Sequence, residues 1–140
     1  MSVLSRVLRV HRRIYIATDG RVGHGMIGRP TLMLRTTGRR SGTTRTAVLV
    51  YARDGEDYLV VPSNGGADDP PAWFHNLRAN PDVEIQVRRE RRRGRAAVVE
   101  PDDPDYERLW AIANENNGDR YRAYQKLTDR PIQVVVVTPA

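Results

Sequence analysis

The sequence predicts a mainly β domain of the α+β class, in which six antiparallel strands form a small barrel with flanking helices. Short apolar runs are separated by turn residues, such as the Asp54-Gly55 pair between two strand-like segments. These runs follow one another as hairpins and do not alternate with helices, which argues against a parallel Rossmann sheet. Strands this short close most readily into a small barrel, and helices can then cover its open ends.

The composition limits the function classes. With 140 residues, the chain can form one domain with its own core. It has no cysteine, and its three histidines, His11, His24 and His75, show no ligand spacing, so we predict no metal site. No apolar run reaches the roughly 20 residues that span a bilayer, and the N-terminus lacks a secretory signal core, so we predict a cytoplasmic protein. The net charge of +6 favours an anionic partner.

Residues 1–28 are predicted to form an N-terminal amphipathic helix followed by a glycine-rich loop. Apolar residues between Leu4 and Tyr15 recur at helical spacing, with arginines on the opposite face. Such a helix either packs on its own domain, which we favour, or associates peripherally with an acidic membrane.

The most informative stretch is residues 31–42, TLMLRTTGRRSG, where an apolar strand leads into a glycine loop. Arg39 and Arg40 lie in this loop, and Arg45 follows as the next strand begins. The glycines allow a tight turn, so backbone amides and guanidinium groups can surround an anion. The alternative is a solvated turn whose arginines face water, and the loop by itself does not decide between the two.

Alternating and continuous apolar runs predict the remaining strands. We expect strands near residues 31–36, 45–53 and 57–62, a second hairpin near 83–98, and a central strand over 132–137. The arginine run at 88–95 is expected at the tip of that second hairpin. A nucleic-acid-binding role for this run is an alternative, but the run lacks interleaved stacking aromatics, and no nucleic-acid partner is expected.

Helices are expected at three further places. The first follows Pro70-Pro71, is capped by Asp68 or Asp69, and ends at Pro81. The second is capped by Asp102 or Asp103 and is followed by a polar loop at 114–119, after which a last short helix carries two tyrosines.

The loop SNGG at residues 63–66 comes just before the first of these helices. A flexible glycine loop followed by a helix N-terminus offers backbone amides to a planar heteroaromatic ring or to an anion. The apolar residues of that helix, Trp73, Phe74 and Leu77, are otherwise core anchors.

The motifs TTGRRSG, RDG, SNGGADDPPAWFHNLRANP and Tyr-x-x-Tyr-Gln, followed by a terminal apolar strand, resemble the deazaflavin-dependent nitroreductase family. Members are actinobacterial oxidoreductases with a split β-barrel, related in fold to FMN-binding pyridoxine-phosphate oxidases. The resemblance covers nearly the whole chain and is weakest over the first 25 residues. It implies a single split β-barrel domain, residues 1–140, that binds coenzyme F420.

The resemblance also implies contacts for each part of the cofactor. The phosphate and oligoglutamate tail would contact Arg39, Arg40 and Ser41, with Arg45 beside them. The ring would contact Pro62, Ser63, Asn64 and Gly65. The ribityl chain and ring edge would lie along Trp73, Phe74, His75, Asn76 and Leu77, and further cofactor contacts are expected at Thr46, Val48, Leu49 and Val50.

No catalytic residue is assigned, because the cofactor performs the hydride transfer. Tyr121 and Tyr124 match family tyrosines that surround the acceptor, so they are either substrate contacts or packing residues of the last helix. Val50 and Gly118 stand where quinone- and nitroimidazole-reducing members have tyrosines.

The implied function is hydride transfer from reduced F420 to a small conjugated electrophile: a quinone, a nitroaromatic or an enone. A carrier protein that binds F420 with little turnover is one alternative. An FMN-dependent split-barrel oxidoreductase is another, since a single phosphate could use the same basic loop. A homodimer is compatible with each of these.

Overall fold

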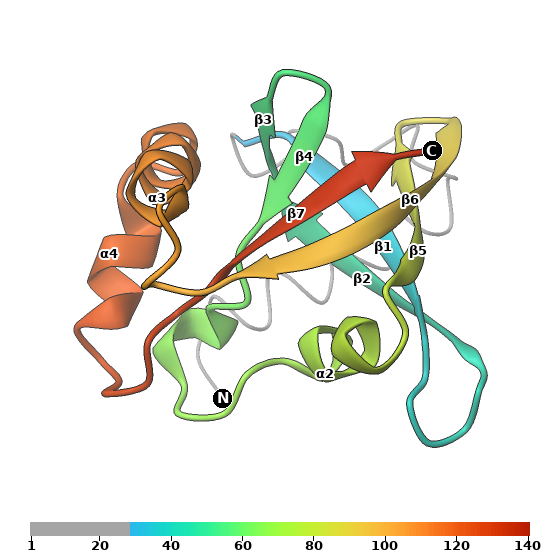
Figure 1. Cartoon of the computed structure of the whole chain (residues 1–140), viewed down its shortest axis with the longest axis horizontal. Coiled ribbons are helices and arrows are strands. Elements are labelled where there is room, and N and C mark those ends of the chain that lie inside the picture. Colours follow the sequence, from blue (N-terminus) through green and yellow to red (C-terminus); the bar gives the residue numbers. More distant parts are fainter. Residues whose placement is uncertain (1–28) are drawn as a thin grey trace.

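The computed structural model describes residues 29–140; the predicted N-terminal helix and the loop with His24 lie outside the described residues. Seven strands form one antiparallel sheet in the order β2-β1-β5-β6-β7-β4-β3 (Figure 1). The strands are β1 (Thr31–Thr37), β2 (Thr44–Val50), β3 (Ala52–Asp54), β4 (Asp57–Val60), β5 (Asp82–Val87), β6 (Glu90–Val99) and β7 (Val134–Pro139). The helices are the 3-10 turn η1 (Asn64–Gly66), α2 (Ala72–Ala79), α3 (Tyr106–Asn116) and α4 (Arg120–Gln125).

The two edge strands of this sheet, β2 and β3, are consecutive in the chain, so the sheet curls into a half-barrel. The predicted antiparallel split barrel is therefore confirmed, with seven strands instead of six. The single strand expected at 45–53 was wrong, because β2 pairs with β1 whereas β3 pairs with β4. The chain changes partner at Tyr51, whose amide donates to the carbonyl of Pro30 at 3.3 Å.

Alternation along the strands fills the barrel interior with apolar side chains. Leu32 and Leu34 of β1 face Ile85 of β5, and α2 adds Phe74 and Leu77 to the same cluster. Each fully buried side chain of this size stabilises the fold by about 1.5–3 kcal/mol. The helix α2 thus covers one end of the half-barrel, as Figure 1 shows.

The helix α3 packs on the outside of the sheet. Its Leu109 is buried against Ala52, Leu59 and Val134, which belong to three different strands. The strand β7 lies inside the sheet between β6 and β4, which confirms the central position expected for the last apolar run. Among the described helices, none is long and apolar enough to cross a membrane.

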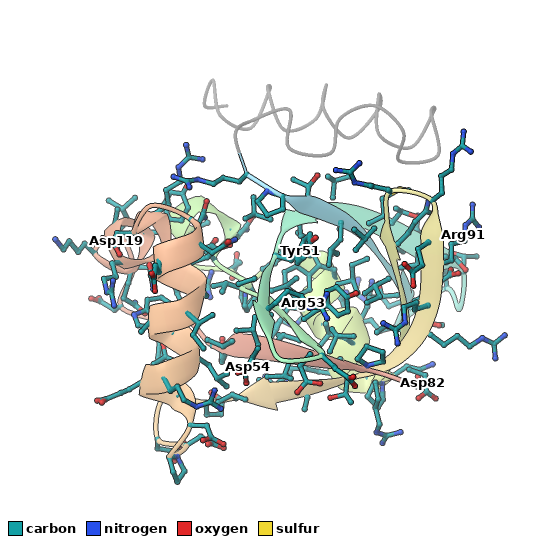
Figure 2. The ribbon with its side chains drawn as sticks, turned by 90° about the horizontal axis from the view of Figure 1, so that it is seen from above. Tyr51, Arg53, Asp54, Asp82, Arg91 and Asp119 are labelled. Atoms are coloured by element: carbon teal, nitrogen blue, oxygen red, sulfur yellow. The ribbon has the colours of Figure 1, made fainter. Side chains whose placement is uncertain are left out.

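The arginine run was wrongly expected at a hairpin tip. Only Arg88 and Arg89 form the turn, and Arg88 adopts a φ of 56° there. Residues 90–95 continue as β6 and pair with β5 along their length. Arginines fit a strand when alternate side chains face solvent, and Figure 2 shows Arg91 on the side of the barrel away from Asp119.

The predicted helix caps were also wrong. The helix α2 follows Pro71 without a side-chain cap, so Asp68 and Asp69 do not cap it, although it ends before Pro81 as expected. The helix α3 begins after Asp105, whose amide donates to the Asp103 carboxylate at 2.9 Å. It continues through Asn116, so the polar loop expected at 114–119 is reduced to its last three residues.

Candidate cofactor site

The loop between β1 and β2, residues 38–43, is a closed turn that we call the basic loop. The Gly38 amide donates to the Thr43 carbonyl at 2.7 Å, and the Gly42 amide donates to the Gly38 carbonyl at 2.8 Å. A Cβ at Gly38 would lie 2.7 Å from the Ser41 Oγ, and Gly42 has a φ of +73°, so both positions need glycine. The glycines found in the sequence therefore have a structural cause.

Asn76 of α2 holds the basic loop in place. Its Oδ1 accepts hydrogen bonds from the backbone amide and from Nη1 of Arg39, both at 3.1 Å. Its Nδ2 donates to the Thr36 Oγ1 at 3.3 Å. Asn76 is 4% exposed, and the oxygen and nitrogen of its side-chain amide are both bonded to protein groups.

The other two arginines of the site are available to a ligand. Arg40 and Arg45 are exposed, and no carboxylate of the described residues pairs with either one. Among residues 29–140, the amides of Arg40 and Ser41 have no hydrogen-bond acceptor, whereas the Ser41 hydroxyl is paired with Thr43 at 2.7 Å. Free amides beside unpaired guanidinium groups fit a phosphodiester and carboxylates.

The four predicted contacts on β2 do not share one face. Leu49 pairs with Leu32 and packs on the barrel interior. Thr46, Val48 and Val50 pair with Arg35, Met33 and Thr31, which point to the opposite face of the sheet. One ligand therefore cannot contact all four side chains from one side of the strand.

The loop that follows β4, residues 62–67, is called the ring loop here. Pro62 and Ser63 are buried, whereas Asn64 and Gly65 are exposed. A Cβ built on Gly65 would meet no atom within 4 Å, so the backbone is open on that side. A flat ring can approach such a backbone closely, which fits the contacts that the resemblance implies.

Three of the predicted contacts on α2 lie in the barrel core. Trp73, Phe74 and Leu77 are at most 8% exposed, which agrees with their alternative role as core anchors. His75 is half-buried and stacks on Phe74 with ring centroids 6.1 Å apart. The helix α2 follows the ring loop in the chain, and its Asn76 is hydrogen-bonded to the basic loop.

The two tyrosines of α4 have different surroundings. Tyr121 is 7% exposed, and its ring centroid lies 6.3 Å from that of Trp110. Burial raises the pKa of Tyr121, which keeps its hydroxyl protonated. Tyr124 is half-buried, and its carbonyl lies 2.8 Å from the position of a Cβ on Gly66, so α4 packs directly against the ring loop.

Arg130 was missed by the sequence reasoning. Its Nε donates to the Ala67 carbonyl at 2.8 Å, and its Nη2 donates to the Ser63 carbonyl at 2.9 Å. Nothing near Arg130 in the sequence signals this contact, because the partners are more than sixty residues away.

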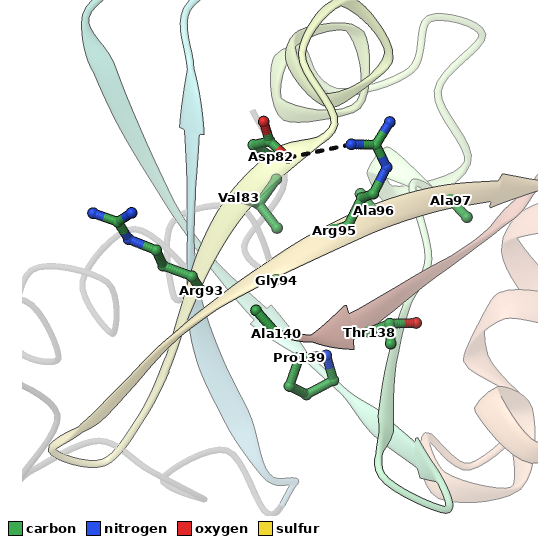
Figure 3. Close-up of a pocket in the computed structure, with 10 residues that line it drawn as sticks. All are labelled: Asp82, Val83, Arg93, Gly94, Arg95, Ala96, Ala97, Thr138, Pro139 and Ala140. Carbon is green, nitrogen blue, oxygen red and sulfur yellow. Dashed lines mark hydrogen bonds and ion pairs between the residues drawn. The ribbon is translucent and has the colours of Figure 1, made fainter.

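A separate groove of about 600 Å³ lies where β5, β6 and β7 meet (Figure 3). Asp82 and Arg95 face each other beside it at 3.5 Å, and Gly94 contributes backbone to its wall. None of the residues that line it belongs to the predicted cofactor contacts.

The curled antiparallel sheet defines a split-barrel protein, and its basic loop and open ring loop are the candidate site for an anionic cofactor with a planar ring. Residues 7–139 match the sequence profile of the F420H(2)-dependent quinone reductase family. An F420H(2)-dependent quinone reductase of Mycobacterium tuberculosis (strain H37Rv) is 54% identical over 134 residues, which cover 95% of this chain and 90% of the relative.

Two solved structures are similar as well. An F420-H2 dependent reductase (FDR-A) is 34% identical with a TM-score of 0.69, over 78% of this chain and 94% of that chain. A structure described as a domain-swapped dimer is 31% identical with a TM-score of 0.71, over 97% of this chain and 99% of that chain. The chain belongs to the F420H2-dependent quinone reductase family.

Proposed function

We propose that this protein transfers a hydride from reduced coenzyme F420 to a quinone. The observation that carries the proposal is the pair of hydrogen bonds between Arg39 and Asn76. These bonds attach the basic loop, with its free amides, to the helix that follows the ring loop. This attachment supports assigning the anionic part of the cofactor to the basic loop and its ring to the ring loop. The family and the relative at 54% identity support the choice of cofactor and acceptor.

The anionic half of the cofactor is assigned to the basic loop. The phosphodiester and glutamate tail would contact Arg40, Arg45 and the amides of Arg40 and Ser41. Arg39 would hold the loop to α2 through Asn76. Charge-assisted hydrogen bonds of this kind are each worth about 1.5–3 kcal/mol. A polyanionic tail makes better use of several unpaired arginines than the single phosphate of FMN does.

The ring half is assigned to the ring loop. Bound reduced F420 supplies the hydride, so the chain itself has to orient the ring and the acceptor and exclude water. The exposed backbone of Gly65 would allow close approach of the ring. The buried Pro62 and Ser63, whose carbonyls accept from Arg130, would support that backbone. Tyr124, which is half-buried beside Gly66, would border the acceptor.

The test is steady-state oxidation of reduced F420 by a simple benzoquinone, followed through the fluorescence of oxidised F420. We expect turnover with F420H2 and none with reduced FMN. Tight F420 binding without turnover would instead identify a carrier protein, and turnover with reduced FMN alone would contradict the cofactor assignment.

We further propose that the protein acts in the cytoplasm as a homodimer on a small-molecule acceptor. The neighbour described as a domain-swapped dimer, similar over 97% of this chain, supports the dimer. Size-exclusion chromatography with light scattering tests this assembly, and a monomer at micromolar concentration would contradict it.

A further inference from the structure

The guanidinium group of Arg130 is hydrogen-bonded to both ends of the ring loop. Its Nε donates to the Ala67 carbonyl at 2.8 Å, and its Nη2 donates to the carbonyls of Pro62 at 3.1 Å and Ser63 at 2.9 Å. Its Nη1 is buried and has no acceptor among the described residues. Because three carbonyls converge on a single guanidinium group, removing it would leave all three without this partner.

The ring loop needs such support because its backbone is unusual. Asn64, Gly65 and Gly66 have φ values of 46°, 66° and 86°, and a positive φ is unfavourable for a residue with a Cβ such as Asn64. The Asn64 side chain donates to the Asp69 carbonyl at 3.0 Å, which connects the loop only to the segment that follows it in the chain. Asn64 therefore carries a steric cost, and the two glycines leave the loop with many accessible conformations, so its shape depends on contacts from outside the loop.

The segment that presents Arg130 is itself fixed to α4. The Gln125 Nε2 donates to the Arg130 carbonyl at 2.8 Å, and the Gln125 Oε1 accepts from the Ile132 amide at 2.9 Å. The Thr128 hydroxyl donates to the Asp68 carboxylate at 2.7 Å, which is a second bond to the loop region. The position of Arg130 therefore follows the position of α4.

We propose that Arg130 is a positioning residue that holds the ring loop in the shape that receives the deazaflavin ring and keeps it aligned with α4. This inference rests on the proposed function. Arginine suits the task because its rigid fork reaches carbonyls in several fixed directions, whereas a lysine ammonium is a compact charge on a flexible stem. Partial burial lowers the pKa of Arg130, while Asp68 and Asp69 act in the opposite direction.

The experiment compares Arg130→Gln and Arg130→Lys with the wild type. The control is Arg108→Gln, which removes an arginine that pairs with Asp54 at 2.9 Å on the outer helix. Two quantities are measured: the Kd for F420, and amide exchange of Gly66 and Ala67 in the free protein. These amides donate to the carbonyls of Ser63 and Asn64 within the loop at 2.9 and 3.2 Å.

We expect Arg130→Gln to raise the Kd for F420 at least tenfold and to speed exchange of both loop amides. Arg130→Lys should give intermediate values, and Arg108→Gln should change neither quantity. A folded Arg130→Gln protein with a wild-type Kd for F420 would overturn the inference, even if its melting temperature fell.

The two proposals can fail separately. If the wild type does not bind F420, the proposed function fails, and the exchange of the loop amides still decides whether Arg130 holds the loop. If the wild type binds F420 and Arg130→Gln binds equally well, the proposed function stands and the role of Arg130 is refuted.

Discussion

Arg39 and Asn76 are joined by two hydrogen bonds that converge on one oxygen. The Arg39 amide and its Nη1 both lie 3.1 Å from the Asn76 Oδ1, although the two residues are 37 positions apart in the chain. The bond through the amide fixes the backbone of the basic loop, and the bond through Nη1 fixes the side chain. The basic loop is therefore bonded to α2 through both its backbone and one of its side chains.

Replacement of Asn76 should therefore both destabilise the protein and weaken cofactor binding. Asn76→Ala removes the acceptor of two part-buried Arg39 donors and the donor to the buried Thr36 hydroxyl, so we expect a loss of about 1–3 kcal/mol in the free energy of unfolding. Denaturant unfolding measures this loss, and F420 titration measures the binding. Asn80→Ala, at the end of the same helix, is the control. An Asn76→Ala protein as stable as this control would refute the stabilising role of the hydrogen bonds between Arg39 and Asn76.

The unpaired arginines should carry the electrostatic part of binding. Arg40→Ala combined with Arg45→Ala should raise the Kd for F420 by roughly 10- to 150-fold per lost contact, from about 1.5–3 kcal/mol each. The matched control, Arg89→Ala with Arg93→Ala, removes the same charge from exposed positions on the β5–β6 hairpin. Equal weakening in both double variants would mean that net charge, rather than the loop, attracts the cofactor.

Stability should fall at alkaline pH in a way that depends on Tyr106. Burial, with a smaller effect from Glu100, raises the pKa of Tyr106 to about 12, and its hydroxyl donates to the Ile132 carbonyl at 2.5 Å. The folded state thus retains a proton that the unfolded state releases above pH about 10. The stabilisation is complete below that pH and is lost as pH rises toward 12.

The check is the free energy of unfolding of wild type and Tyr106→Phe at pH 8, 10 and 11. The variant is expected to be less stable at pH 8, because it lacks the hydrogen bond to Ile132. Its stability should then fall less steeply with pH than that of the wild type. Parallel pH curves would show that Tyr106 does not titrate in this way.

The two tyrosines of α4 should separate into a packing residue and a ligand-facing residue. Tyr121→Phe removes a hydroxyl from a buried position, so we expect about 0.5–1.5 kcal/mol of lost stability and an unchanged KM for the quinone. Tyr124→Phe should have the opposite profile, with a raised KM and nearly unchanged stability. A raised KM for Tyr121→Phe at full stability would contradict this division.

Local patterns in the sequence were sufficient for much of the fold. The apolar run in β1, the alternation in β5, the Asp54-Gly55 turn and the proline that ends α2 are all properties of neighbouring residues, and each was predicted correctly. The strand break at Tyr51 was not predictable in this way, because it depends on which distant strands pair with each side of it. The arginines of β6 were misplaced for a similar reason, since only pairing with β5 reveals that they belong to a strand.

The candidate site was predictable only where its residues are neighbours in the chain. The glycines of residues 38–43 predicted a tight turn before any tertiary contact was known, and the arginines made that turn a candidate for anion binding or for a solvated loop. The hydrogen bonds that Asn76 makes to this loop and that Arg130 makes to the ring loop could not be predicted from the sequence, because each residue contacts a segment distant from it in the chain. Strand geometry also divides the contacts expected on β2, since residues one position apart point to opposite faces.

The most direct test is equilibrium binding of F420 and of its deazaflavin fragment without the phosphodiester and glutamate tail, with FMN as a third ligand. Quenching of cofactor fluorescence reports each Kd. We expect F420 to bind at micromolar concentration or tighter, the fragment to bind far more weakly, and FMN not to compete. Equal affinity for F420 and the fragment, or preferential binding of FMN, would contradict the assignment of the basic loop to the anionic part of F420.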